Sequence, residues 1–151
     1  MRTALVAFLA VLLMPASALA ARPVPASVVG AVDRKVPVAN YMPTRMLPGF
    51  SFQRWSFKAG VLWLRFVNKA GVLVDWTVAP MKGTCRAGMQ KSFQLAGNKV
   101  WWADDGDIQR AWRCVFAADG VARRLTASST TPPTRLADVG LGAVVASGKR
   151  Y

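Results

Sequence analysis

The sequence predicts a mainly β domain of the α+β type: a small antiparallel sheet, free to curl or to adopt a barrel-like form, with a C-terminal helix and one disulfide. Short runs rich in Val, Trp and Phe, separated by Gly, Asn and Asp, indicate strands and turns from residue 49 onward. The chain contains no Glu, a residue that is common in helix interiors, and this also favours strands. A length of 151 residues fits one domain.

Residues 1–20 have the three parts of a secretory signal peptide. Arg2 supplies a basic start, residues 4–14 are apolar, and Ala18 and Ala20 are the small residues that precede a cleavage point. The apolar run is too short to span a bilayer, and we expect no transmembrane segment in the mature chain. Cleavage after Ala20 predicts a periplasmic or secreted protein.

The mature chain is strongly basic. Residues 1–20 hold one basic residue and no acid, so the remainder carries 19 Lys and Arg against 7 Asp, a net charge of +12. Such a charge favours an anionic partner. The absence of His excludes Ser-His-Asp and Cys-His nucleophile systems and metal sites built on imidazole. No cofactor is expected.

Residues 21–48 form a Pro-rich lead-in to a single domain at residues 49–151. Prolines disfavour both helices and central strands, so we expect at most a short edge strand at residues 28–32. The lead-in either wraps the domain or stays mobile. Its prolines are Pro23, Pro25, Pro37, Pro43 and Pro48.

Residues 61–67 and 72–78 predict a hairpin through a turn at residues 68–71. Pairing Val67 with Val72 sets Arg65 opposite Val74. The same register sets Trp63 opposite Trp76, which gives one face an aromatic pair between two valine pairs.

The second half of the chain predicts further strands. Residues 89–95 and 99–103 flank a turn at residues 96–98, and Asp119-Gly120 is a strong turn signal between residues 108–116 and 121–127. Cys85 and Cys114 are the only two cysteines. In an oxidising compartment they are expected to form a disulfide that stabilises the domain.

The end of the chain predicts a helix. Pro132 and Pro133 end the sheet, Thr134 is the expected N-cap, and Gly148 is the expected end. One helical face is expected to be buried. It carries Leu136, Val139, Ala143 and Val144.

A patch of cations and tryptophans is the candidate binding site. We expect Arg110, Arg113 and one of Arg123 and Arg124 to share the solvent face of a hairpin. Neighbouring strand residues face opposite ways, so one of the two adjacent tryptophans should be buried. An exposed Trp beside Arg groups suits an anionic ligand, whereas the simpler interpretation is a solvated basic surface. The candidate residues are Lys99, Trp101, Trp102, Arg110, Arg113, Arg123 and Arg124.

Asp104, Asp105 and Asp107 form the one acidic cluster in the sequence. Three carboxylates around a glycine are weak candidates for a cation site, but an EF-hand loop needs further oxygen ligands and a closing Glu. An acidic turn between strands is the simpler interpretation.

Three classes of function remain open. The first is an exported, non-enzymatic binding domain at the bacterial cell envelope, whose anionic partner is a lipid headgroup in peripheral membrane contact, lipopolysaccharide or a wall polymer. The second is an interaction or inhibitor domain that docks on an acidic exported protein. The third is an Asp-dependent hydrolase built on the acidic cluster. Nucleic acid is disfavoured as a partner because export sends the basic charge elsewhere.

Overall fold

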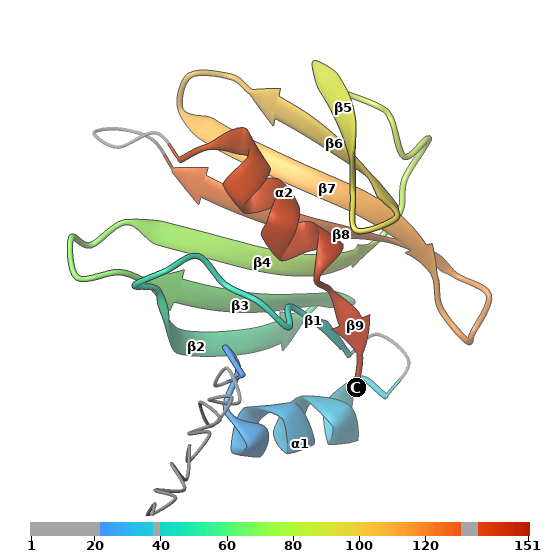
Figure 1. Cartoon of the computed structure of the whole chain (residues 1–151). Coiled ribbons are helices and arrows are strands. Elements are labelled where there is room, and N and C mark those ends of the chain that lie inside the picture. The colour runs from blue at the N-terminus through green and yellow to red at the C-terminus, as the bar shows by residue number, and fades with distance from the viewer. Residues whose placement is uncertain (1–21, 38–39, 131–135) are drawn as a thin grey trace, which may run out of the picture.

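The computed structural model describes residues 22–37, 40–130 and 136–151, and the predicted signal peptide lies outside these residues. Within them, seven strands form one antiparallel sheet in the order β2-β3-β4-β8-β7-β6-β5, and two short strands pair separately (Figure 1). The large sheet has edges at β2 and β5 and is not closed into a barrel. The mainly β fold is therefore confirmed. Its strands are β2 (Ser51–Lys58), β3 (Val61–Val67), β4 (Leu73–Pro80), β5 (Lys91–Leu95), β6 (Asn98–Asp104), β7 (Ile108–Phe116) and β8 (Ala122–Thr130).

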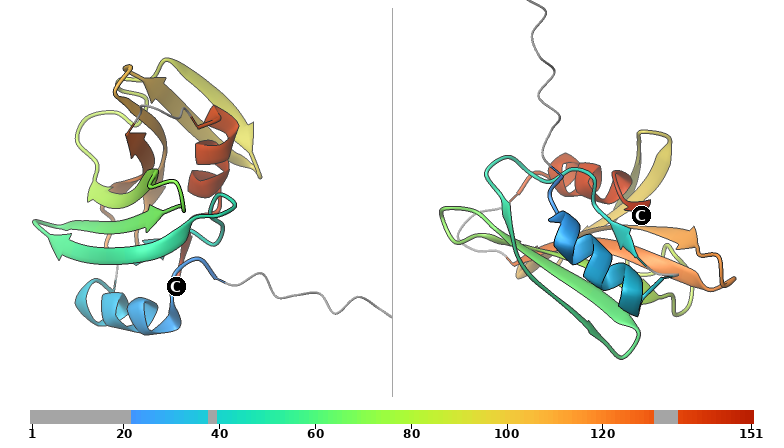
Figure 2. Two further views of the ribbon diagram at one scale, coloured as in Figure 1. Left: turned by 90° about the vertical axis from the view of Figure 1, so that its left-hand side faces the viewer. Right: turned by 90° about the horizontal axis from the view of Figure 1, so that it is seen from below.

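The two faces of the large sheet differ in what covers them. Helix α2 (Asp138–Ala146) packs across β5 to β8 on one face, which we call the inner face (Figure 1). The same core receives buried side chains from helix α1 (Ala26–Lys35) and from β1 (Tyr41–Met42), which pairs with β9 (Lys149–Arg150) in the small sheet. The opposite, outer face carries no helix in the described part of the chain. A long loop between β4 and β5 lies on this outer side, across the sheet from α2 (Figure 2, left).

The lead-in wraps the domain and contains a helix, so the edge strand expected at residues 28–32 is wrong. Pro25 precedes α1 and Pro37 follows it, and the helix itself contains no proline. Proline is tolerated at the start of a helix, where its missing N–H has no intrahelical partner. Val32 and Val36 are buried in the main core, which fixes the helix to the sheet.

The β3–β4 hairpin forms, but its register differs by one residue from the predicted one. Val67 lies opposite Leu73 rather than Val72, so Leu64 faces Trp76 and Trp63 lies on the other face. The observed register buries the apolar side chains of both strands on the inner face. They are Leu62, Leu64, Phe66, Val74, Trp76 and Val78.

Two polar interactions favour this register. It sets Arg65 opposite Asp75, and two hydrogen bonds of 2.7 and 2.8 Å join the guanidinium and the carboxylate. This register also makes the loop one residue longer than predicted, at residues 68–72. Asn68 closes the loop, because its side-chain oxygen accepts hydrogen bonds from the backbone N–H groups of Ala70 and Val72. The predicted register would have left Arg65 opposite an apolar side chain.

The other predicted connections are confirmed. Residues 96–97 join β5 to β6, and Asp119 and Gly120 lie in the loop that joins β7 to β8. Cys85 and Cys114 form the expected disulfide, with 6.0 Å between their Cα atoms. Strand β5 begins at Lys91, two residues later than expected.

The C-terminal helix is confirmed, but its buried face differs from the predicted one. Val139 and Ala143 are exposed, whereas Leu141, Val144 and Val145 are buried. The reason is close packing, because a Cβ at Gly142 would lie 2.6 Å from the Phe93 ring. A glycine that costs helix propensity thus lets the helix approach the sheet. The predicted cap, Thr134, and the prolines before it lie outside the described residues.

Candidate functional site

Strand alternation divides the predicted patch between the two faces of the sheet. Arg110 and Arg124 lie on the outer face, as do Lys99 and Trp101. Trp102, Arg113 and Arg123 lie on the inner face. Trp102 is buried and Trp101 is half-buried, which confirms that the adjacent tryptophans face opposite ways. The expectation that Arg110 and Arg113 share a face is wrong, because residues three apart on a strand point in opposite directions.

Arg113 supports the C-terminal end of α2. Its Nε donates a hydrogen bond of 3.1 Å to the Val145 carbonyl, and its other donors reach the Gly148 carbonyl and the Asn98 side chain. Burial lowers the pKa of this guanidinium from its ordinary value. A cation beside the unpaired carbonyls of a helix end is stabilising. Each of the three guanidinium nitrogens of Arg113 thus donates a hydrogen bond within the fold, which assigns this residue a structural role.

Arg123 is also a structural residue. It is buried and donates hydrogen bonds of 2.7 and 2.6 Å to the two carboxylate oxygens of Asp119. The Arg123 guanidinium lowers the pKa of Asp119 to about 2, and the carboxylate in turn raises the pKa of Arg123. This pair ties the β7–β8 loop to the inner face of β8.

The outer face has Arg124 and Trp112 at its centre. The Arg124 guanidinium lies 5.4 Å from the centre of the Trp112 ring and donates a 3.2 Å hydrogen bond to the Thr84 carbonyl. Trp112 Nε1 donates a 2.6 Å hydrogen bond to the Cys85 carbonyl. These contacts and the disulfide hold the β4–β5 loop (residues 81–90) against β7 and β8.

A groove runs beside this loop. Two cavities of about 360 and 150 Å³ lie on this face, Arg124 and Thr126 line both of them, and we call the two together the Arg124 groove. Lys82 lines the larger cavity, and Arg110 lines the smaller one. The larger cavity is lined further by Ala59, Val61, Ala79, Pro80 and Met81, and the smaller by Ala87, Gly88 and Trp112.

The cations of the groove differ in their pairing. Arg110 forms an ion pair of 2.8 Å with Asp105. Among the described residues, neither Arg124 nor Lys82 has a carboxylate within ion-pair distance. Arg124 is half-buried, and a partly desolvated cation attracts an anion more strongly than one in bulk water. The groove can therefore accept an anionic group at Arg124.

A second group of cations lies on β2 and β3. Arg54 and Arg65 face each other across the strands, and their guanidinium carbons lie 5.2 and 4.7 Å from the centre of the Trp63 ring. Asp75 neutralises Arg65, and Arg54 is exposed. The sequence prediction missed this group because the predicted register put Trp63 on the same face as Trp76.

Lys82 and Thr126 were also missed. The alternation of Arg124, Thr126 and Ser128 with Leu125 and Ala127 along β8 indicates a polar outer face. This alternation was the sequence signal that could have placed Thr126 on the outer face. Nothing in the local sequence shows that the β4–β5 loop brings Lys82 close to Arg124 and Thr126 on β8.

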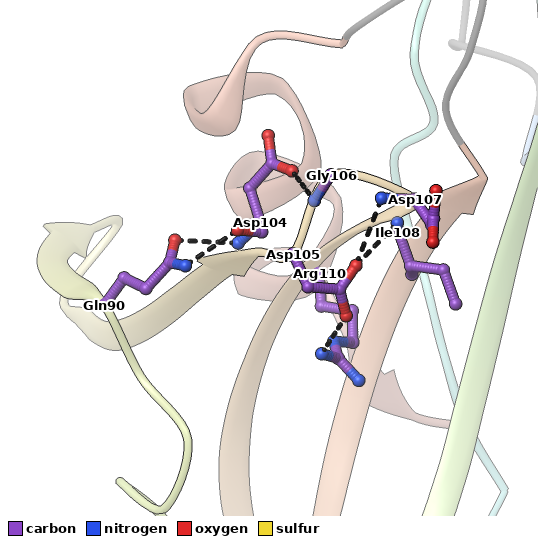
Figure 3. Close-up of polar contacts among 7 residues, drawn as sticks. All are labelled: Gln90, Asp104, Asp105, Gly106, Asp107, Ile108 and Arg110. Atoms are coloured by element: carbon purple, nitrogen blue, oxygen red, sulfur yellow. Dashed lines mark hydrogen bonds and ion pairs between the residues drawn. The ribbon is translucent and has the colours of Figure 1, made fainter.

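The acidic cluster forms a turn (Figure 3). Asp105 Oδ1 accepts hydrogen bonds from the backbone N–H groups of Ile108 and Asp107, and its Oδ2 contacts Arg110. The hydrogen bond from Ile108 is the main cause that lowers the pKa of Asp105. Asp104 accepts from the backbone of Gly106, and the three carboxylates point in different directions. Within the described residues no group of three His, Cys or Asp side chains is placed to bind a metal ion.

Comparison with protein-family models, curated proteins and solved structures gives no significant match to this chain. In the described part of the chain, neither helix has the length and apolar character needed to cross a bilayer. The function is therefore inferred from the residues and geometry of the groove.

Proposed function

We propose that this chain is an exported, non-enzymatic protein that binds an anionic component of the bacterial cell envelope through the Arg124 groove. One observation carries the proposal. A half-buried arginine and a nearby lysine line a groove on the helix-free face of the sheet, and neither has a carboxylate partner among the described residues. An anion from outside the molecule supplies the negatively charged partner that these two cations lack among the described residues.

The location of the protein is part of the proposal. It is supported by the signal-peptide pattern of residues 1–20 and by the disulfide between Cys85 and Cys114, which is stable in an oxidising compartment. The net charge of +12 predicted for the mature chain would concentrate the protein near polyanions and speed their encounter.

Co-sedimentation with isolated envelope fractions tests the proposal. The mature, oxidised protein is expected to pellet with the fractions at low salt and to return to the supernatant at about half-molar salt, where the Debye length is only a few ångströms. Changing both Arg124 and Lys82 to Gln is expected to abolish pelleting at low salt. Lys69→Gln, which removes one charge from the exposed β3–β4 loop, is the control and should behave as the natural protein.

Two outcomes contradict the proposal. If the protein stays in the supernatant at both salt concentrations, its charge is a solvated surface. If it pellets in a complex that resists salt and has a fixed stoichiometry, the interaction is with another protein rather than with a polyanion.

A further inference from the structure

We infer that the anionic partner is a phospholipid bilayer, and that the tip of the β7–β8 hairpin (residues 116–121) places Phe116 among its acyl chains while Arg124 and Lys82 contact its headgroups. This inference rests on the proposed function and names the class of partner. Its basis is the exposure of Phe116, the unpaired cations beside it and the small apolar area of the tip.

Phe116 is the most exposed large apolar side chain of the described residues. Its exposed fraction is 81%, whereas the fractions of Phe57, Met89, Val121 and Val139 are 55% or less. Burial of a phenyl ring from water is favourable, and this fold leaves that contribution unused. Val121, at the other end of the same loop, is also exposed. The hairpin tip therefore presents apolar side chains from both of its sides.

The fold holds this tip in place without using the Phe116 ring. Asp119 pairs with Arg123, and its Oδ1 also accepts a 3.1 Å hydrogen bond from the Val121 N–H. The Ala117 N–H donates a 3.2 Å hydrogen bond to the Val121 carbonyl. The loop projects from one side of the molecule (Figure 1; Figure 2, right). A fixed, projecting tip can carry an aromatic ring into another phase without first becoming ordered.

Unpaired cations lie beside Phe116 on the outer face of the sheet. Phe116 lies opposite Ala122 on β8, and Arg124 lies two residues further along that strand on the same face. The Cα atoms of such diagonal neighbours are about 7 to 8 Å apart. The Met81 N–H donates a 2.8 Å hydrogen bond to the Ala122 carbonyl, which brings Lys82 to the same end of the sheet. Among the described residues neither cation has a carboxylate within ion-pair distance.

An anionic bilayer matches both features at once. Its headgroups attract cations at the surface, and its acyl chains cover an apolar side chain that reaches below them. A wall polymer would pair with Arg124 and Lys82 but would leave the Phe116 ring in water. A stable protein interface buries about 800 Å² on each partner around an apolar centre, whereas the tip offers only two large exposed apolar side chains.

Sedimentation of the mature, oxidised protein with lipid vesicles tests the inference. Vesicles of equal parts phosphatidylglycerol and phosphatidylcholine are expected to bind the protein at low salt, and vesicles of phosphatidylcholine alone should bind it at least ten-fold more weakly. Phe116→Ser is expected to weaken binding to the anionic vesicles about ten-fold, because the ring is no longer transferred from water. The variant should keep the salt dependence of the natural protein, whereas Arg124→Gln should make it shallower.

Phe57→Ser is the matched control. It removes a second exposed phenyl ring, but Phe57 lies opposite Leu62 on the other face of the sheet, so vesicle binding should not change. Phe116→Trp keeps an aromatic ring at the tip and should bind as the natural protein does. Its emission should be quenched by brominated acyl chains more strongly than that of Phe57→Trp. Circular dichroism of each variant verifies that the sheet is retained.

Three results would overturn the inference. Equal affinity for vesicles with and without phosphatidylglycerol contradicts the headgroup contacts. Unchanged vesicle binding by Phe116→Ser contradicts insertion of the tip. Pelleting with envelope fractions without binding to the anionic vesicles identifies a wall polymer or a protein as the partner instead. These results leave envelope binding intact, whereas failure to pellet with envelope fractions overturns the proposed function itself.

Discussion

At the scale of single residues, Arg113 and Arg124 have different roles although they lie on adjacent strands. Arg113 donates hydrogen bonds to two carbonyls at the end of α2 and to Asn98, whereas Arg124 donates to one loop carbonyl and lines a groove. The sequence places both in a basic segment. It cannot show that the acceptors of Arg113 come from residues 145 and 148, more than thirty positions away.

Arg113→Met is expected to reduce the free energy of unfolding by about 3 kcal/mol, because it leaves several buried acceptors without their charged donor. Urea denaturation followed by circular dichroism measures this. Arg110→Gln is the comparison and should cost less than about 1 kcal/mol, since its ion pair with Asp105 is largely exposed. Unchanged stability of Arg113→Met, with loss of envelope binding, would show that Arg113 is a binding residue instead.

The Asp119 carboxylate predicts how the free energy of unfolding changes at acidic pH. The Arg123 guanidinium lowers its pKa to about 2 in the folded protein, below the ordinary value of 3.8. The contribution of this carboxylate to stability is therefore complete above about pH 4 and is lost as the pH falls toward 2. Asp119→Asn is expected to remove part of the acid sensitivity of the free energy of unfolding.

Urea denaturation at several pH values between 2 and 6 measures this effect. Asp107→Asn is the control, because Asp107 forms no ion pair among the described residues. The account of the Arg123–Asp119 pair is contradicted if Asp119→Asn loses as much stability between pH 4 and pH 2 as the natural protein does.

At the scale of elements, the sequence predicted a hairpin correctly where the alternation of apolar residues was compatible with only one way of pairing the strands. The β7–β8 hairpin follows from two alternating runs around Asp119-Gly120. The β3–β4 hairpin was ambiguous, because residues at both phases of β3 are apolar, with Val61, Trp63 and Val67 on one face and Leu62, Leu64 and Phe66 on the other. Local alternation cannot choose between them. The choice comes from the Arg65–Asp75 pair and from the packing of Trp76 in the core.

The β4–β5 loop is the element on which the groove depends. Replacing Cys85 and Cys114 by Ser is expected to lower the free energy of unfolding by about 3 to 4 kcal/mol, as for a cross-link across a loop of this length. It should also expose Trp112, which the loop now covers, and shift tryptophan emission to longer wavelength. The core on the inner face does not include the two cysteines, so the far-ultraviolet circular dichroism should persist.

Thermal and urea unfolding, together with emission spectra, measure these effects. The account of the loop is contradicted if the variant keeps both the stability and the emission of the oxidised natural protein. In that case the disulfide would not be what holds the loop over Trp112.

At the scale of the whole molecule, the sequence predicted the class of fold but not how the layers assemble. The lead-in was expected to contain at most a short edge strand, yet it forms α1, which shares the core with the sheet through Val32, and Val36 directly after the helix is buried in the same core. The bulk charge indicated an anionic partner, and the division of the cations between two faces reduced the candidate site to the Arg124 groove. The large cavity also requires that β4 pair with β8, because this pairing brings together residues more than forty positions apart in the sequence.

The salt dependence of polyanion binding tests the central claim most directly. The affinity of the mature protein for isolated envelope fractions is measured by co-sedimentation from low to moderate salt and compared with that of the single variant Arg124→Gln. We expect the slope of log affinity against log salt to be shallower in the variant by about 1, because the variant makes one ionic contact fewer and its binding therefore releases fewer counterions. Equal slopes and equal affinities would contradict the claim that this groove binds the anion.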